Sequence, residues 1–385
     1  MKKSRHFTIL ILLVGLLLLS GCGERQHRER PEKIPLYLDV RGFREELMER
    51  MEEKPIYNLK NLLITKESLL SFKYNEKTIF PTGDRLDSDI SPEELLELAK
   101  NPGLGIRSLH EQGYTGEGIT VAIIDQNMFL DHPEFAGKVL NYRDFGCDMD
   151  KTGSMHAPAV TSLLVGETIG TAPGAKLYFA AVPTWKWDAA YPAEAMDWIV
   201  EENEKLPEGE KIRLVSVSAG FGNGEFSNAE AWIQSRQRAE EAGILVLDGD
   251  WEHSMFSAAY FDTSGDLSWE SVECLIPGQP NYSWEERRTQ RLAGYEEDKL
   301  FVPISPRTVA EQYFEDDSSY QYCGYSGISW GIPYAAGVLA MGWQIAPEKT
   351  GEEMAALLID TAYQQNDMKF IYPEAFIEAL LAEQQ

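Results

Sequence analysis

The chain is poor in basic residues for its length. Lysine and arginine together number 35, against 62 aspartates and glutamates in 385 residues, so the formal net charge is −27. Binding to nucleic acid requires a basic face for the phosphates, and we therefore expect no nucleic-acid partner. An acidic surface attracts cationic peptides or metal ions only weakly and in a salt-dependent way. It more simply keeps an exported protein soluble near an anionic cell surface.

Cysteine is also scarce, with only four in the chain. Their spacing matches no metal-ligand pattern. Apart from Cys22, three remain, and an odd number cannot all pair within one chain. One disulfide with a free thiol and three buried thiols are both compatible with the sequence. These three are Cys147, Cys274 and Cys323.

One long apolar run is present, at residues 7–19, and it follows three basic residues and no acidic ones. It is too short to span a bilayer comfortably and is typical of a signal peptide. The run ends in Leu19-Ser20-Gly21-Cys22, which resembles the bacterial lipobox. The resemblance implies a lipoprotein signal peptide over 1–21 and a lipid on Cys22, hence a chain anchored to the cell membrane on its extracytoplasmic face. An uncleaved signal anchor with a chance cysteine is the alternative.

Residues 22–105 are expected to form a lipid-anchored tether and a helical lead-in. The segment 23–35 is polar, as in a flexible linker, and 43–53 has apolar residues at helical spacing. A capping box with proline at the first helical position, Ser91-Pro92-Glu93-Glu94, starts a helix that should stop at 101–103. The lead-in is compatible with a small propeptide or with an outer layer of the domain that follows.

From about residue 106 onward, apolar β-branched runs alternate with amphipathic segments. This order predicts an α/β fold, a doubly wound parallel sheet with helices on both faces. Active sites in such sheets form at the carboxyl ends of the strands. No internal repeat or low-complexity tract interrupts the pattern. The expected strands are 119–125, 175–182, 212–218 and 244–247, and the expected helices include 193–205, 228–243 and 352–363.

Three segments resemble the signature blocks of the subtilisin-like serine proteases, in the family's order of Asp, His and Ser. In the first, 113–135, a glycine-rich turn precedes a strand that ends in Asp125, and His132-Pro133 follows. In the second, 156–166, His156 opens a helix rich in small residues. In the third, 327–338, Ser329 lies on a Gly-x-Ser turn ahead of a small-residue helix.

The resemblance implies a subtilisin-like peptidase domain over 106–385, with Asp125, His156 and Ser329 as a catalytic triad. It implies a serine endopeptidase that forms an acyl-enzyme on Ser329 and acts on extracytoplasmic proteins or peptides, with no required cofactor. Each residue alone has an ordinary structural explanation, such as a turn former or a helix cap. Their joint order within matching motifs favours catalysis.

The resemblance also places Ser218, Ala219 and Gly220 on the strand that binds the substrate backbone. At the second oxyanion donor, normally an asparagine, this chain has Asp250. An ionised carboxylate there would repel the oxyanion, and loss of one donor costs about 2.7–4 kcal/mol. A protonated Asp250 could donate instead, or Asn223 or Asn281 could supply the donor.

The chain departs from the family pattern elsewhere, at Gln126-Asn127, at 157–159 and at Trp330. These departures leave an alternative function open, a catalytically impaired lipoprotein with a subtilisin fold that binds peptides or partner proteins. A purely structural surface lipoprotein is a further alternative. Calcium, common in the family, could bind at acidic pairs such as Asp316-Asp317, but no ligand loop of known spacing is present. An aromatic-rich insert, 251–325, could shape the cleft or cover a sheet edge.

Overall fold

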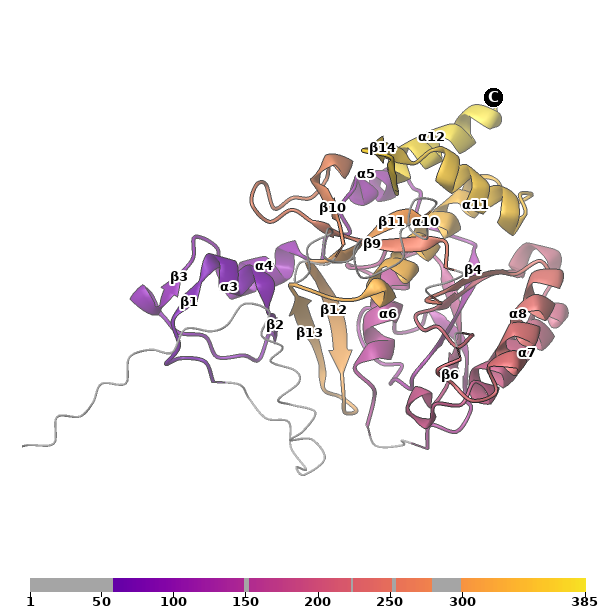
Figure 1. The fold of residues 1–385 in the computed structure, drawn as a ribbon, viewed down its shortest axis with the longest axis horizontal. Helices are drawn as coiled ribbons and strands as arrows, with labels where there is room; N and C mark the ends of the chain where they lie inside the picture. The colour runs from indigo at the N-terminus through magenta and orange to yellow at the C-terminus, as the bar shows by residue number, and fades with distance from the viewer. Residues whose placement is uncertain (1–57, 149–151, 223, 251–253, 279–298) are drawn as a thin grey trace, which may run out of the picture.

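The computed structural model describes residues 58–148, 152–222, 224–250, 254–278 and 299–385 (Figure 1). The expected signal peptide, Cys22 and the tether therefore lie outside the described residues, as do Asn223 and Asn281. Within the described ranges, no helix is both long and apolar enough to cross a membrane.

A sheet of five parallel strands forms the centre of the fold, in the order β5-β6-β4-β7-β8. The expected strands appear in it with their ends shifted by one residue or so. Because all five run the same way, their carboxyl ends meet at one edge of the sheet. The strands are β4 (Thr120–Asp125), β5 (Val139–Asp144), β6 (Lys176–Ala181), β7 (Ile212–Val217) and β8 (Leu245–Asp248).

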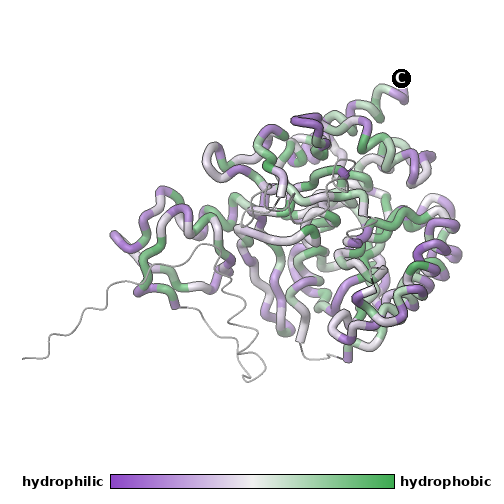
Figure 2. The backbone as a smooth tube through the Cα atoms, viewed as in Figure 1, coloured by the Kyte–Doolittle hydropathy of each residue, from purple (hydrophilic) through white to green (hydrophobic). Residues whose placement is uncertain are grey.

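Helices cover both faces of this sheet, as β4 illustrates. Val121 and Ile123 belong to the core on the side of α6 (His156–Val165) and α10 (Gly331–Ile345). Ala122 and Ile124 belong to the core on the side of α7 (Ala190–Lys205) and α8 (Ala229–Glu241). A strand buried on both faces is a continuous apolar run rather than an alternating one. Figure 2 shows the apolar centre and the more polar outer side of α7 and α8. The α/β fold with helices on both faces is confirmed.

The helices of this domain begin and end near their expected positions. A capping box is present at the start of the expected helix near 352, since Thr350 accepts from the amide of Glu353 and the Glu353 side chain accepts from the amide of Thr350. The helices are α5 (Ile106–Glu111), α6 (His156–Val165), α7 (Ala190–Lys205), α8 (Ala229–Glu241), α10 (Gly331–Ile345), α11 (Gly351–Asp360) and α12 (Pro373–Glu383).

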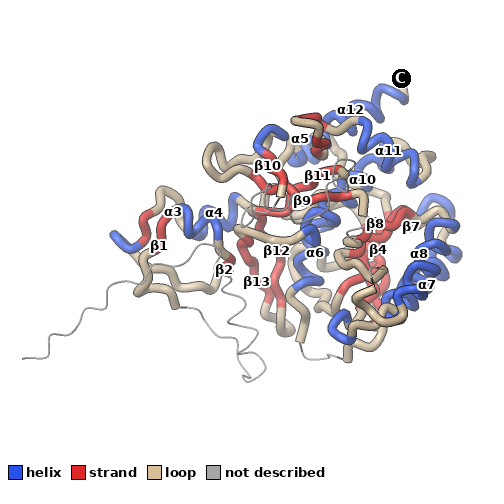
Figure 3. Tube along the Cα trace, in the orientation of Figure 1, coloured by secondary structure: helices blue, strands red, loops and turns tan. Residues whose placement is uncertain are grey.

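Further strands lie beside the parallel sheet, and the sequence pattern did not identify them (Figure 3). They form a mixed sheet in the order β10-β9-β11-β15-β14 and a hairpin of β12 and β13. Their segments contain polar and aromatic residues that hide the alternation of a strand. They are β9 (Phe256–Phe261), β10 (Leu275–Pro277), β11 (Leu300–Ser305), β12 (Arg307–Gln312), β13 (Ser318–Cys323), β14 (Tyr363–Gln365) and β15 (Met368–Phe370).

The described part of the lead-in contains short strands as well as helices and lies against the β12–β13 hairpin (Figure 1). Its strand β2 pairs antiparallel with β13, and α4 contacts both strands of the hairpin. The predicted capping box at Ser91 opens α4. Apolar side chains of the lead-in join the core of the domain. The elements are β1 (Ile64–Thr65), α3 (Lys66–Ser71), β2 (Lys73–Asn75), β3 (Leu86–Asp87) and α4 (Pro92–Leu98).

Cys147, Cys274 and Cys323 are all thiols in the structure. Burial raises the pKa of the Cys147 thiol to about 12 and that of Cys274 to about 12 as well. Both therefore stay protonated near neutral pH and behave as small apolar side chains.

Candidate active site

Asp125 and His156 form a hydrogen-bonded pair at the carboxyl edge of the parallel sheet. Asp125 is the last residue of β4 and is 5% exposed, and His156 is the first residue of α6. Nδ1 of His156 lies 2.9 Å from Oδ1 and 2.8 Å from Oδ2 of Asp125. Because a carboxylate only accepts hydrogen bonds, Nδ1 carries the proton and Nε2 is left as an acceptor. The side chain of His156 remains 21% exposed, so Nε2 can serve as a base towards a ligand.

Gln126 and Asn127, which depart from the family pattern, form hydrogen bonds to Asp125 and to the loop before His156. The amide of Gln126 donates to Oδ1 of Asp125 at 2.8 Å, and its side chain donates to Thr184. Asn127 is bonded to the loop before His156: its side-chain amide donates to the carbonyl of Thr152, and its own carbonyl accepts from the amide of Ser154. The departure from the family pattern therefore fixes the loop that leads into α6.

Ser329 lies close by on a short 3₁₀ turn, Ile328–Trp330, that leads into α10. The sequence placed this serine at the helix start; it precedes the first residue of α10 by two positions. Its hydroxyl donates to the carbonyl of Ser218 at 3.2 Å, and the hydroxyl of Ser218 donates to the carbonyl of Ser329 at 2.9 Å. Ser329 is thus hydrogen-bonded to Ser218, in the segment expected to bind the substrate backbone, rather than to His156.

Trp330, on the turn that carries Ser329, packs against the ring of His156. Its indole meets the imidazole of His156 edge to face, with the ring centroids 5.4 Å apart and the planes at 68°. Trp330 is buried. An aromatic contact of this kind restricts the orientation of the imidazole. The structure therefore brings Asp125, His156 and the turn of Ser329 to one place.

The segment 218–220 continues from β7 and lies against the turn that follows β8. The amide of Gly249 donates to the carbonyl of Ala219 at 3.0 Å. A Cβ on Gly220 would lie 2.8 Å from Cα of Asp250, so the two backbones touch only because residue 220 is glycine. Asp250 therefore lies beside the expected substrate strand. Its side chain is buried, and Oδ2 would lie 2.8 Å from a Cβ on Gly222.

Asp248 is a buried residue that sequence reasoning missed. It ends β8, its Oδ1 accepts from the amide of Asp250 at 3.3 Å, and its Oδ2 accepts from Arg236 of α8 at 3.0 Å. Aspartate often holds a turn through the amide two residues on. The repeat Asp-Gly-Asp was the available signal, but nothing in the sequence pointed to Arg236 as the partner.

Within the described ranges, no group of three or more His, Cys, Asp or Glu side chains could hold a metal ion. Of the acidic pair considered for calcium, Asp317 forms an ion pair with Lys77. Calcium binding at this pair stays a prediction.

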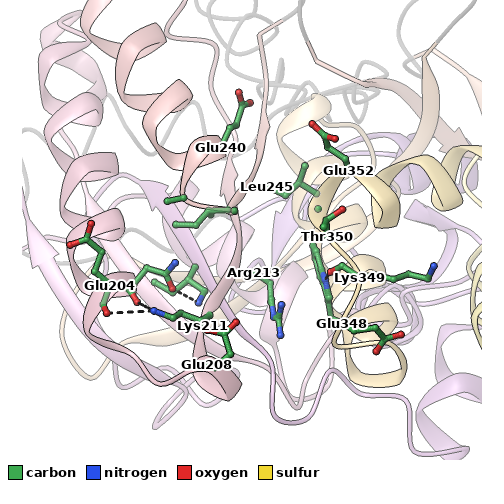
Figure 4. Close-up of a pocket in the computed structure, with 17 residues that line it drawn as sticks. Glu204, Glu208, Lys211, Arg213, Glu240, Leu245, Glu348, Lys349, Thr350 and Glu352 are labelled. Carbon is green, nitrogen blue, oxygen red and sulfur yellow. Dashed lines mark hydrogen bonds between the residues drawn. The ribbon is translucent and has the colours of Figure 1, made fainter.

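A pocket of about 820 Å³ lies at the other end of the parallel sheet, where β7 and β8 begin (Figure 4). Lys211 is engaged with the carbonyls of Asn203 and Glu204 there. Five glutamates and three basic residues share its lining. The pocket is remote from Asp125, which lies at the opposite edge of the sheet. Because acidic and basic side chains both line the pocket, its charge does not indicate a class of ligand.

The chain matches no protein-family profile. It is similar in sequence to the subtilisin-like protease PopC of Myxococcus xanthus (strain DK1622), at 26% identity over 308 residues. The match covers 67% of this chain, and the chain spans only 58% of the length of PopC.

Solved structures share the fold. The prenylagaramide maturation protease PagA aligns with a TM-score of 0.52 at 16% identity, over 72% of this chain and 98% of that one. Fervidolysin from Fervidobacterium pennivorans, a keratinolytic enzyme related to subtilisin, aligns with a TM-score of 0.50 at 16% identity, over 74% of this chain and 46% of that one. The chain is therefore similar in sequence to a subtilisin-like protease, and it shares the fold of these solved structures.

Proposed function

We propose that the protein is a serine endopeptidase with Ser329 as nucleophile, His156 as general base and acid, and Asp125 as the residue that orients His156. The observation that carries the proposal is the hydrogen-bonded Asp125–His156 pair beside the turn of Ser329. Related proteases of this fold support it. The substrates are proteins or peptides.

The proposed reaction uses Nε2 of His156 and Oγ of Ser329. Nε2 of His156 accepts the proton of Ser329 as Oγ forms a bond to the substrate carbonyl carbon. The protonated imidazole then gives that proton to the leaving amine as the C–N bond breaks, and an ester to Ser329 remains. Water hydrolyses the ester with His156 again as base. Before the first of these steps, the hydroxyl of Ser329 must leave the carbonyl of Ser218 and form a hydrogen bond with His156.

The same proposal places the enzyme on the extracytoplasmic face of the cell membrane, held by a lipid on Cys22. The signal-peptide pattern of residues 1–22 supports this location. Cys22→Ser should move the protein from the membrane fraction to the soluble fraction. Retention of the variant in the membrane fraction would favour the signal-anchor alternative.

The test of the nucleophile is labelling with a fluorophosphonate probe, which reacts covalently with activated serines. The soluble chain 23–385 should be labelled, Ser329→Ala should not, and Ser264→Ala, at an exposed serine, should be labelled like the wild type. Labelling that survives Ser329→Ala would remove Ser329 from the proposed role.

A second candidate function is peptide binding without turnover. The buried Asp250 beside the substrate strand favours it, because a carboxylate in that position opposes the developing oxyanion. A folded wild type that is not labelled but still binds extended peptides would support this second function over the first.

A further inference from the structure

The segment that carries Ser329 runs along the lead-in before it reaches the active site. Strand β13 pairs with β2 of the lead-in, with Tyr322 opposite Tyr74 and Cys323 opposite Lys73. One residue further, the amide of Gly324 donates to the carbonyl of Phe72 at 3.2 Å. The path to the nucleophile is thus hydrogen-bonded to the lead-in up to five residues before Ser329.

The contact at Gly324 is a close backbone approach. A Cβ at this position would lie 2.3 Å from the carbonyl oxygen of Leu70 and 2.6 Å from the carbonyl carbon of Ser71. No side chain fits there unless the lead-in or the nucleophile segment moves. The next residue, Tyr325, has the ammonium of Lys73 over its ring, 4.4 Å from the centroid.

The other side of the same segment is held by the domain itself. The hydroxyl of Ser326 donates to the carbonyl of Ile304 in β11. The residues 324–326 are therefore clamped between the lead-in and β11. Because Ser329 follows this segment by only a few residues, a displacement of the lead-in would also displace Ser329.

Buried polar contacts attach the lead-in to the hairpin. Glu311 of β12 is buried, and its carboxylate accepts from Asn75 of β2 at 2.9 Å. It also accepts from Ser319 at 2.8 Å and from Gln321 at 3.2 Å. Removal of the lead-in would take the Asn75 donor away from a buried carboxylate, which is costly.

The turn at residues 103–105, where the lead-in joins the domain, is buried. Leu104 is 1% exposed and has a φ of 52°, a left-handed conformation that is rare for such a residue. Its amide donates to the carbonyl of Trp269 at 2.9 Å, and the amide of Gly105 donates to Glu270 at 3.0 Å. Proteases bind substrates as extended strands, and this buried turn cannot be presented in that form.

We propose that the lead-in remains in the active protease and that residues 70–75 act as a positioning element for the nucleophile segment 324–329. This inference rests on the proposed function of Ser329. The lead-in is then a structural part of the enzyme rather than a segment removed during maturation. Misplacement of a reacting group by about 1 Å can cost about a hundredfold in rate, so a clamp on this segment has a catalytic effect.

The first test is the mass of the active species. Chain 23–385 is labelled with the fluorophosphonate probe, and the intact mass of the labelled polypeptide is measured. We expect the labelled chain to retain residues 58–105. A labelled species that begins at or after residue 106 would overturn the proposal.

The second test separates positioning from folding. Gly324→Ala should lower the limiting labelling rate by about a hundredfold, and Lys73→Met by about tenfold, with little change in the probe concentration that gives half the limiting rate. Lys73→Arg, which keeps a cation over Tyr325, should restore most of the rate. Gly209→Ala, where a Cβ meets nothing within 4 Å, is the matched control.

Amide hydrogen exchange of residues 324–330 gives a readout that needs no activity. Exchange there should rise in Gly324→Ala and Lys73→Met and not in Gly209→Ala. Unchanged exchange and unchanged labelling in both variants would overturn the positioning role. If the wild type is not labelled at all, the proposed function fails, and the exchange data then decide the structural part alone.

Discussion

Two buried aspartates end strands of the same sheet edge, and they have different partners. Asp125 ends β4 and Asp248 ends β8, with β7 between them. Each carboxylate accepts from the backbone amide of the turn that follows its strand. A further partner is the imidazole of His156 for Asp125 and the guanidinium of Arg236 for Asp248.

The difference lies in what the partner can do. An imidazole gains and loses a proton near neutral pH, so the Asp125 pair can take part in proton transfer. A guanidinium stays protonated, so the Asp248 pair can only hold the turn that carries Asp250. Under the proposed function, the same residue type at equivalent strand ends serves chemistry in one case and holds a turn in the other.

The strongest way to break this comparison is Asp125→Asn. The amide can donate to Nδ1 and so favours the wrong tautomer of His156, and we expect the peptidase rate to fall about 10⁴-fold. The free energy of unfolding should change far less than the rate. A loss below tenfold would show that His156 is oriented by other contacts, such as that with Trp330.

The next largest effect concerns Asp250. Asp250→Asn replaces an acid by a hydrogen-bond donor and should raise the acylation rate by about a hundredfold, because a carboxylate beside the oxyanion would oppose it. Asp250→Ala removes the carboxylate without adding a hydrogen-bond donor. Its rate therefore distinguishes the loss of repulsion by the carboxylate from the gain of a donor to the oxyanion. If Asp250→Asn and the wild type are acylated at the same rate, Asp250 does not face the oxyanion.

Arg236→Met tests the structural half of the comparison. It leaves the buried carboxylate of Asp248 without its guanidinium, and we expect a loss of about 3 kcal/mol in the free energy of unfolding, measured by urea denaturation. Arg238→Met, on the same helix, breaks an exposed pair with Asp197 and should cost less than about 1 kcal/mol. Equal losses in the two variants would contradict the assigned role of Asp248.

A similar comparison can be made between His156 and a second histidine, His132. The effect expected for His132, on the pH dependence of stability, is the smallest of those predicted. His132 is fully buried; its Nδ1 accepts from the amide of Glu134 and its Nε2 donates to the carbonyl of Ser319. Burial lowers the pKa of His132, although Glu134, Asp131 and Glu311 act in the opposite direction. Below about pH 6.5 the unfolded chain therefore binds a proton that the folded chain does not, and stability falls as the pH drops.

His132→Gln removes this proton uptake. The free energy of unfolding of the variant should therefore decline less between pH 7.5 and pH 5 than that of the wild type, as measured by denaturation at each pH. Parallel declines in the two proteins would assign the acid sensitivity to other groups.

The parallel sheet, its flanking helices, and the positions of Asp125 at a strand end and His156 at a helix start were all predictable from local sequence patterns. The reason is physical: strands buried on both faces are apolar runs such as 119–125, and capping boxes such as those at Ser91 and Thr350 mark helix starts locally. The triad was found through its order in three motifs, and its catalytic role remains a prediction.

The contacts between residues far apart in the chain became known only from the tertiary structure. Arg236 reaches Asp248 because α8 packs beside β8, and the lead-in strand β2 pairs with β13 although some 250 residues separate them in the chain. The strands β9 to β13 lacked a clear alternation, so their pairing had no local signal. Partner choice depends on long-range packing, and a sequence pattern with a period of two or 3.6 residues does not contain that information.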